Sequence, residues 1–294
     1  MSGADPLTAR PEVRVRAPAA TVRRLLTDVT AWPRIFPAVV HAERLDDGSG
    51  GPARVWVLRE EHDEVSVVTV RQVVDHDGRS VRFRPDAHAD ALLPLGEDWS
   101  VESPAEGESL VRLDSGVADL AALRAAAEEE SAESPVYLEF ADSVTVAGAA
   151  RDVYDFLYRL EDWPEVVPHV ATASVREIGP HVRFVEIDNA GPNGPVHTTE
   201  AVRIGFPHRT IVEKHRLLPP LASLHLGRWT VEESPGGATV TATHVVVIKE
   251  AGVASVLGEG TTLAEARTWI RGALGGNSVV VAEQAREYAE RRAR

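Results

Sequence analysis

Two segments of the chain share one arrangement of apolar residues and prolines. The first runs from Leu26 to Pro37 and the second from Leu157 to Pro168. Each follows a stretch whose apolar residues recur at helical spacing, and each carries a Trp-Pro pair and a second proline four residues after the first. Because proline suits the first turn of a helix and disrupts its interior, each segment predicts a helix, a break and a short second helix.

The tryptophans keep nearly one offset between the two halves of the chain. The offset from Trp32 to Trp163 is 163 − 32 = 131, and the offset from Trp99 to Trp229 is 229 − 99 = 130. A repeat of this length lies outside the range of solenoids and propellers. The sequence therefore predicts two tandem copies of one domain, residues 1–134 and 135–294.

Apolar runs separated by turn residues predict the same order of elements in both halves: a strand, two short helices, six strands and a closing helix. The six strands are expected near residues 39–45, 53–59, 65–74, 80–84, 95–102 and 110–113, and near 171–178, 182–187, 196–204, 210–217, 223–232 and 239–249. The closing helices are expected at 117–130 and at 260–292, the second interrupted at Gly275-Gly276. Strands joined by short turns form an antiparallel meander. The predicted fold class is α+β, with each six- to seven-stranded curved sheet wrapped around a C-terminal helix and a cavity between them.

Composition narrows the class of protein. The chain has 294 residues, 44% of them hydrophobic, and no cysteine, which excludes disulfides and thiolate chemistry. No apolar run approaches the roughly 18 residues of a membrane span, and no signal peptide is evident, so we expect a cytoplasmic protein. A formal charge of −14 argues against binding to nucleic acid or to an anionic membrane.

The order of elements and several motifs resemble the helix-grip fold of START-like and Bet v 1-like domains, and within it the two-domain aromatase/cyclases of bacterial type II polyketide synthases. The motifs of the second half are the segment 162–165, the strands that contain Arg203, Arg216 and Trp229, and the segment 275–278. In the first half, Trp32-Pro33, Arg71, Arg84 and Trp99 carry the resemblance.

The resemblance implies a reaction and its partners. Such enzymes receive a poly-β-ketone chain from an acyl carrier protein, guide aldol closure of the first ring and then dehydrate it to an aromatic ring. The two-domain subclass generally acts on chains reduced at the ninth carbon and closes the ring between the seventh and twelfth carbons. No cofactor or metal is implied. Other polyketide synthase subunits are expected partners, and a homodimer is left open.

Arg203 is the leading catalytic candidate, and Arg71 is its predicted counterpart, since 203 − 71 = 132. Thr199 would share the face of the strand with Arg203. An inward arginine could polarise a ketone and stabilise an enolate, whereas an outward one would be a solvated surface residue. The resemblance places the key arginine of the family at Arg203.

Arg216 follows Arg203 at a spacing of 216 − 203 = 13, and Arg84 follows Arg71 at the same spacing, 84 − 71 = 13. The equal spacing suggests one architectural position, either at the mouth of the pocket or on the solvated surface. We further expect Arg216 to join Arg267 or Arg271 in a mouth that receives the carrier protein.

Histidines crowd the second half, and His225 and His244 fall within predicted strands. If they point inward, they could move protons at neutral pH. No HxH or HExxH spacing suggests a metal site.

The remaining candidates are aromatic residues and one asparagine. Trp163 either packs in the core or contacts substrate, and Trp99 and Trp229 are candidates for the cavity wall. Asn277 is either a helix N-cap or a residue that faces the pocket, as the resemblance implies.

Two functions from different classes remain open on the sequence. One is an aromatase/cyclase whose second domain is catalytic while the first is structural or gates the substrate. The other is a non-catalytic protein that binds or transports a hydrophobic ligand in the same kind of cavity.

Overall fold

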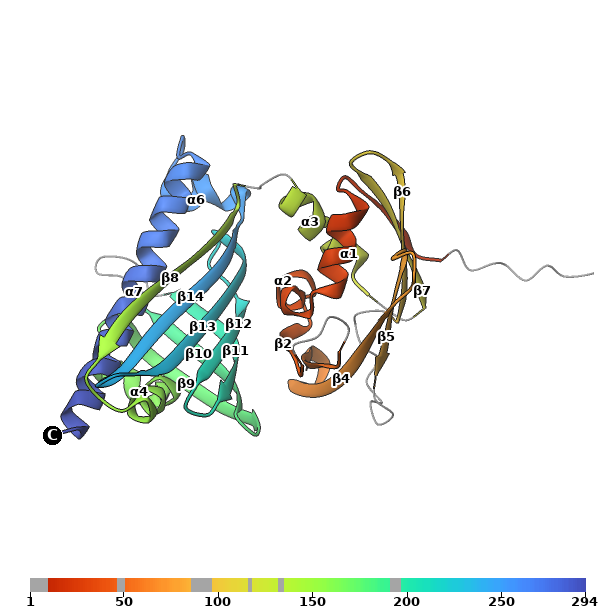
Figure 1. The fold of residues 1–294 in the computed structure, drawn as a ribbon. Helices are drawn as coiled ribbons and strands as arrows, with labels where there is room; N and C mark the ends of the chain where they lie inside the picture. The colour runs from red at the N-terminus through yellow and green to blue at the C-terminus, as the bar shows by residue number, and fades with distance from the viewer. Residues whose placement is uncertain (1–9, 47–50, 86–96, 116–117, 132–134, 191–196) are drawn as a thin grey trace, which may run out of the picture. The chain divides into compact units, whose positions relative to one another are not determined.

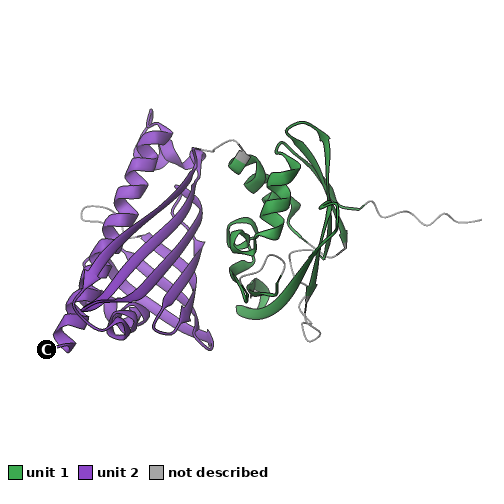
Figure 2. Cartoon of the chain, in the orientation of Figure 1, with its two compact units in different colours: residues 1–134 green, residues 135–294 purple. Residues whose placement is uncertain are grey.

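The chain forms two compact units, Met1–Ser134 and Pro135–Arg294 (Figure 2). The computed structural model describes residues 10–46, 51–85, 97–115, 118–131, 135–190 and 197–294. Among these residues, no helix combines the length and the apolar character needed to span a membrane.

Unit 1 begins with a strand and a broken helix, continues with six strands and ends with a helix (Figure 1). Its elements are β1 (Glu12–Val15), α1 (Ala19–Thr27), η1 (Val29–Ala31), α2 (Trp32–Ile35), β2 (Val39–Arg44), β3 (Ala53–Arg59), η2 (Glu60–His62), β4 (Glu64–Val74), β5 (Ser80–Pro85), β6 (Asp98–Ala105), β7 (Glu108–Ser115) and α3 (Leu120–Ser131). The predicted starts of β6 at residue 95 and of α3 at residue 117 lie outside the described residues.

Unit 2 repeats this order and ends with a much longer helix. Its elements are β8 (Tyr137–Val146), α4 (Ala150–Tyr158), η3 (Leu160–Asp162), α5 (Trp163–Val166), β9 (Val170–Gly179), β10 (Val182–Asn189), β11 (His197–Phe206), β12 (Thr210–Leu217), β13 (Ala222–Ser234), β14 (Gly237–Ile248), η4 (Glu250–Gly252), α6 (Val253–Leu257) and α7 (Leu263–Arg292).

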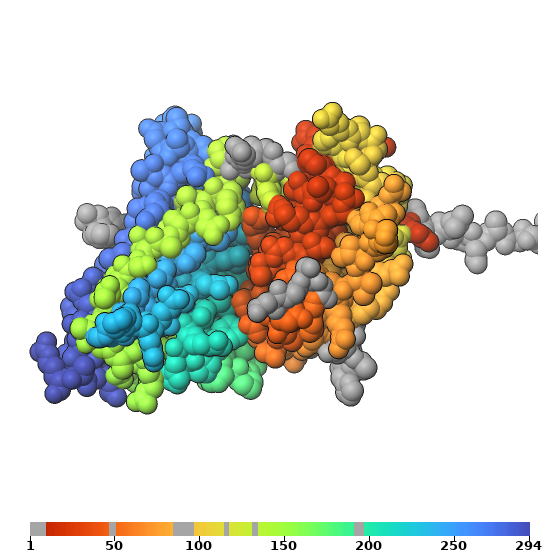
Figure 3. All heavy atoms as spheres, in the orientation of Figure 1, coloured from red at the N-terminus to blue at the C-terminus, as the bar shows by residue number. Residues whose placement is uncertain are grey.

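The two sheets have the same topology. Their strand orders are β1-β7-β6-β5-β4-β3-β2 and β8-β14-β13-β12-β11-β10-β9, and the neighbouring strands are antiparallel. In unit 2, α7 packs against β8, β14 and α4, and β8 and α7 lie side by side on its surface (Figure 3). The predicted fold class, two tandem sheets each packed on a C-terminal helix, is confirmed.

The predicted interruption of the last helix is wrong. Helix α7 begins after a capping box between Thr262 and Glu265 and continues through Gly275 and Gly276 to Arg292. A Cβ atom at Gly275 would lie 2.7 Å from Oδ2 of Asp142 and would also meet the guanidinium of Arg271. The absent side chain at Gly275 thus leaves room for the Arg271–Asp142 ion pair and does not break the helix.

The cores of the two units differ. In unit 1 most of the buried apolar residues of the sheet and the helices form one continuous cluster. In unit 2 they form two clusters. Along β14, Ala242 belongs to one cluster and Val246 to the other, and His244 lies between them. On α7, Ser278 likewise separates Ile270 from Val281. Polar side chains therefore cross the interior of unit 2 from strand to helix.

Candidate functional site

The Trp-Pro segments hold the end of the first helix in each unit. The indole Nε1 of Trp32 donates a hydrogen bond of 3.1 Å to the carbonyl of Leu26 in α1, and that of Trp163 donates one of 3.2 Å to the carbonyl of Phe156 in α4. These carbonyls lie in the last turn of their helices, where intrahelical partners are missing. Both indoles are buried, so the interpretation of Trp163 as a core residue is favoured over contact with substrate.

Arg203 points inward from β11. Its Nη2 donates a hydrogen bond of 2.7 Å to the carbonyl of Leu157, and its Nε lies 3.2 Å from Oε1 of Glu213 on β12. The guanidinium also lies over Trp163, with 5.4 Å between Cζ and the ring centroid. The predicted inward orientation is therefore what the structure shows. However, the side chain is 0% exposed. Its guanidinium therefore cannot contact a substrate ketone in this structure, contrary to the expectation from the sequence.

The counterpart of Arg203 in unit 1 is Gln72, and the assignment of Arg71 was wrong by one residue. Nε2 of Gln72 donates a hydrogen bond of 3.3 Å to the carbonyl of Leu26, just as Arg203 donates to Leu157. Both pairs keep the offset of the tryptophans, since 203 − 72 = 131 and 157 − 26 = 131. Side chains alternate along a strand, so a one-residue shift changes the face. Arg71 lies on the exposed face of β4, which argues against its predicted catalytic role.

The equal spacing of the second arginine pair is also a coincidence of sequence. In the register of unit 1, Arg71 lies directly opposite Arg84, whereas in unit 2 Arg203 lies opposite Glu213. Arg84 is exposed and pairs with Asp98 at 2.9 Å. Arg84 thus forms a surface ion pair, which does not support a role in binding substrate.

Arg216 does not form a pocket mouth with the arginines of α7. Its guanidinium lies 4.8 Å from the ring centroid of Phe184, on the face of the sheet opposite to Arg203. Arg267 instead donates hydrogen bonds to backbone carbonyls near the start of unit 2, and Arg271 pairs with Asp142 at 2.7 Å. The predicted arginine-lined mouth is therefore wrong, because its members lie on different faces and already have partners.

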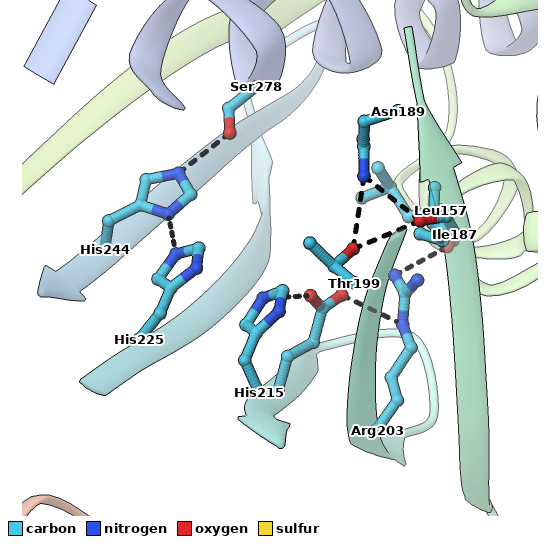
Figure 4. A network of polar contacts seen from close by, with 10 residues as sticks. Leu157, Ile187, Asn189, Thr199, Arg203, His215, His225, His244 and Ser278 are labelled. Atoms are coloured by element: carbon cyan, nitrogen blue, oxygen red, sulfur yellow. Dashed lines mark hydrogen bonds and ion pairs between the residues drawn. The ribbon is translucent and has the colours of Figure 1, made fainter. Parts of the chain in front are cut away.

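A line of polar side chains continues from Arg203 across the inner face of unit 2 (Figure 4). Glu213 and His215 are two residues apart on β12 and share this face, with 4.0 Å between Oε2 of Glu213 and Nε2 of His215. His215 stacks on His225 of β13, with 4.2 Å between ring centroids and an angle of 8° between ring planes. The side chains of Glu213 and His215 are 16% and 13% exposed, so this part of the line is not closed to solvent.

The line ends in a hydrogen-bonded chain that joins two strands to the last helix. Nε2 of His225 lies 3.0 Å from Nδ1 of His244, and Nε2 of His244 lies 2.8 Å from Oγ of Ser278 on α7 (Figure 4). His225 and His244 thus point inward, the orientation in which the sequence left them a role in moving protons. Gly227 lies opposite both Glu213 and His244 in the register, so no side chain stands between them.

Burial keeps these histidines neutral near physiological pH. Removal from water lowers the pKa of His215, and the charge of Glu213 opposes that shift. Burial lowers the pKa of His225 well below its ordinary value, helped by the neighbouring histidines. The pKa of His244 falls to about 4, again mainly because of burial. A neutral imidazole has one nitrogen that donates and one that accepts a proton, so the cluster can both give and take protons.

Three further candidates lie on or near this interior. Trp229 is buried in the apolar cluster beside the polar line, while Trp99 is fully buried in the apolar core of unit 1. Thr199 is partly buried on the face of Arg203 and accepts a hydrogen bond of 3.1 Å from Asn189 (Figure 4). A role for Trp229 or Thr199 in binding substrate stays a prediction.

Asn277 lies in the middle of α7 and is exposed, so its interpretation as a helix N-cap is wrong. The neighbouring Ser278 makes the contact with the sheet. A role for Asn277 in binding substrate stays a prediction.

Sequence reasoning missed Glu213, Ser278 and Gln72. Glu213 stands two residues before His215, so strand alternation alone could have placed both on one face. No local pattern marks Ser278, because its partner is 34 residues earlier on another element. Within the described residues, no group of three or more histidine, aspartate or glutamate side chains is arranged to hold a metal ion.

Comparisons with known proteins agree with the duplicated architecture. Residues 7–135 and 146–263 each match a family described as polyketide cyclase / dehydrase and lipid transport. The chain is 32% identical to the granaticin polyketide synthase bifunctional cyclase/dehydratase of Streptomyces violaceoruber, over 95% of this chain and 93% of that protein. It is also 32% identical to the actinorhodin polyketide synthase bifunctional cyclase/dehydratase of Streptomyces coelicolor, over 90% and 92%.

Two solved structures match both units. The di-domain ARO/CYC StfQ from the steffimycin biosynthetic pathway has a TM-score of 0.86 and 29% identity, covering 97% of this chain and 99% of that one. The di-domain ARO/CYC BexL from the BE-7585A biosynthetic pathway has a TM-score of 0.83 and 34% identity, covering 96% and 98%.

Proposed function

The chain belongs to the polyketide cyclase/dehydrase family as a two-domain aromatase/cyclase of type II polyketide synthases, and from this membership we propose that unit 2 carries the chemistry. Its substrate would be a ketoreduced poly-β-ketone chain on an acyl carrier protein, whose first ring it closes and dehydrates. We expect the reaction to take place in the cytoplasm beside the other synthase subunits. A homodimer stays a prediction.

The observation that carries the proposal is the contrast between the two interiors. In unit 2, the paired inner positions of β11 and β12 hold Arg203 and Glu213, and histidines follow on the neighbouring strands. In unit 1 the corresponding pair on β4 and β5 is Gln72 and Phe83, inside one apolar cluster. Ring closure and loss of water both require proton transfer, and among the described residues only the interior of unit 2 offers a set of groups for it.

His215 is the proposed general base. A methylene between two ketones loses a proton readily once a base lies within hydrogen-bond reach. His215 is neutral, is open to solvent in part and lies beside a carboxylate that favours its protonated form. After it takes the proton, the imidazolium faces Glu213, whose negative charge stabilises it.

Arg203 has a positioning role in this proposal. Its guanidinium is closed to solvent and is held between Glu213 and the carbonyl of Leu157. It would fix the Glu213 carboxylate in place beside His215 and supply the counter-charge for that partly buried group. This role replaces direct contact between Arg203 and the ketone of the substrate.

The test replaces His215 by Gln, which keeps a polar side chain but does not titrate in this range. We expect the rate of aromatised product from carrier-bound substrate to fall about a hundredfold or more, because general base catalysis typically contributes 10²–10⁴-fold. His41→Gln is the matched control, since His41 is a buried histidine of unit 1 that packs on Trp56. Thermal melting confirms that both variants are folded.

The alternative, a non-catalytic binding protein of the same fold, predicts a different result. In that case His215→Gln would leave the yield and timing of aromatised product unchanged. Equal losses in the His41 and His215 variants would instead indicate a shared effect on folding or on both units, and would reject the assignment of the chemistry to unit 2.

A further inference from the structure

The hydrogen-bonded chain His225–His244–Ser278 links two strands to α7 and ends in a polar atom on each side. One end is Nδ1 of His225, because Nε2 of that ring contacts His244. The other end is the hydroxyl of Ser278, which meets the remaining nitrogen of His244. Each neutral imidazole can donate with one nitrogen while it accepts with the other, and the hydroxyl of Ser278 can donate and accept at one oxygen. Protons can therefore shift along the chain without any net charge.

The neighbours of the chain favour movement of protons between neutral forms. Phe140 of β8 lies 5.0 Å from His244, centroid to centroid, and His215 stacks on His225. Burial also disfavours an imidazolium at either ring, as the lowered pKa values of both show. A histidine that cannot hold a proton is a poor final acceptor, but it suits a relay that passes the proton on at once.

We propose that His225, His244 and Ser278 form a proton relay that serves the dehydration step, with Ser278 as the acid for the departing hydroxyl. The proposal rests on the assignment of the chemistry to unit 2. It adds residues with a separate task, because His215 and Glu213 serve the removal of the proton that starts ring closure.

The step balances in atoms and electrons. After ring closure, the substrate carries a hydroxyl on the carbon next to an acidic C–H. The C–H bond breaks, and its proton goes to Nδ1 of His225 while its electron pair forms the new C=C bond. His225 passes its Nε2 proton to Nδ1 of His244, and His244 passes its Nε2 proton to Oγ of Ser278. The Ser278 hydroxyl gives its own proton to the substrate hydroxyl, the C–O bond breaks, and water leaves.

No oxidant or second reactant is required, and no member of the relay ends with a charge. The two rings finish in their opposite tautomers, with Ser278 donating to His244 and His244 donating to His225. Exchange with solvent water after the product leaves restores the starting arrangement. The relay therefore couples removal of a proton at one point to protonation of the leaving group at another.

The experiment follows single turnovers of Ser278→Ala with carrier-bound substrate, quenched at short times and analysed by mass spectrometry. We expect ring closure at the rate of the unaltered protein, and dehydration slowed about a hundredfold, in line with general acid catalysis. A ring-closed species heavier by one water should therefore accumulate. Ser278→Thr keeps the hydroxyl and should restore dehydration. The rate without protein is subtracted.

Ser143→Ala is the matched control, since it removes a serine hydroxyl that makes a contact of the same 2.8 Å length with Thr241 at an exposed position. It should dehydrate normally. His244→Phe is the second variant, because the phenyl ring can still pack on Phe140 while the relay is cut. It should accumulate the same ring-closed species if Ser278→Ala does not fold.

Two outcomes overturn the relay. Dehydration at the ordinary rate in folded Ser278→Ala or His244→Phe, with His215→Gln still impaired, would reject the relay and leave the proposed function standing. Normal turnover in His215→Gln would reject the proposed function itself. As a second readout, the dependence of the dehydration rate on the deuterium content of the solvent should be curved in the unaltered protein, where several protons move, and linear in Ser278→Ala.

Discussion

The buried histidine chain should make unit 2 less stable as the pH falls from about 6.5 to about 4. The pKa of His244 is about 4 in the folded protein, against 6.5 for an unperturbed histidine. Between these two pH values, His244 binds a proton in the unfolded chain but stays neutral in the folded chain. The free energy of unfolding is therefore largest above pH 6.5 and decreases as the pH falls.

The magnitude follows from the shift in pKa. A difference of 6.5 − 4 = 2.5 pH units corresponds to about 3 kcal/mol, at 1.36 kcal/mol per unit. The pKa of His225 is lowered in the same direction and adds to the loss. His244 is faced by Glu213 and His215 of β12, Asp142 of β8 and Arg271 of α7, of which the carboxylates oppose the shift and the arginine and histidine reinforce it.

The perturbation is His244→Phe, which removes the titrating ring and keeps an aromatic side chain against Phe140. The assay is urea unfolding at pH 7.5, 5.5 and 4.5 with a brief deuterium pulse read peptide by peptide, so that β13 and β14 report on unit 2 separately. The variant should be less stable than the original protein at pH 7.5. Between pH 7.5 and 4.5, its free energy of unfolding should decrease by roughly 2 kcal/mol less than that of the original protein. An identical pH dependence in both proteins would refute the account of a buried, neutral His244.

Two further substitutions test the packing around the site. Arg203→Gln introduces the residue that unit 1 has at this position; the amide can still reach the carbonyl of Leu157 but leaves Glu213 without its counter-charge. We expect the free energy of unfolding to fall by about 3 kcal/mol, and by less when Glu213→Gln is added. A single variant as stable as the original protein would exclude a stabilising ion pair. Gly205→Ala puts a Cβ atom 2.5 Å from the hydroxyl of Tyr154 and should lower the free energy of unfolding in urea by about 1–3 kcal/mol. Gly272→Ala is the control, because the space around Gly272 is open, and it should not destabilise the protein. Similar urea midpoints for the two glycine variants would contradict this packing.

The sequence predicted the fold well because its strongest signals are local. The Trp-Pro pairs mark the ends of α1 and α4, and their indoles hold the carbonyls of Leu26 and Phe156. Turn residues separate the strands, and consecutive strands with short connections pair with each other. The meander order from β2 to β7 and from β9 to β14 follows from these features, whereas the pairing of β1 with β7 and of β8 with β14 is a long-range contact.

Register was the first limit of prediction. The offsets 203 − 72 = 131 and 203 − 71 = 132 look equally good in the sequence, yet the choice between them decides whether Gln72 or Arg71 matches Arg203. The shared hydrogen bond to a helix carbonyl and the exposed position of Arg71 distinguish them. A similar limit applied to Gly275-Gly276. Glycine often marks the end of a helix, but here Gly275 makes room for the side chain of Arg271 within a continuous helix.

The site was the second limit, because its contacts join distant parts of the chain. The sequence left the orientation of His225 and His244 open. Their contact depends on the register of β13 and β14, and their link to Ser278 depends on how α7 crosses the sheet. Residue types alone cannot show that three polar side chains form one chain. Nor could they show that Arg203 is paired with Glu213 and closed to solvent.

We propose that the substrate reacts on the inner face of unit 2. A carrier protein that bears a stable oligoketone mimic with a photoreactive group tests it directly, by crosslinking to the full chain and peptide mass spectrometry. We expect crosslinks to residues of β12, β13 and α7 near His215, His225 and Ser278, and we expect them to disappear when an unlabelled mimic competes. Crosslinks that fall in unit 1, or on the opposite face of the unit 2 sheet near Phe184, would contradict it.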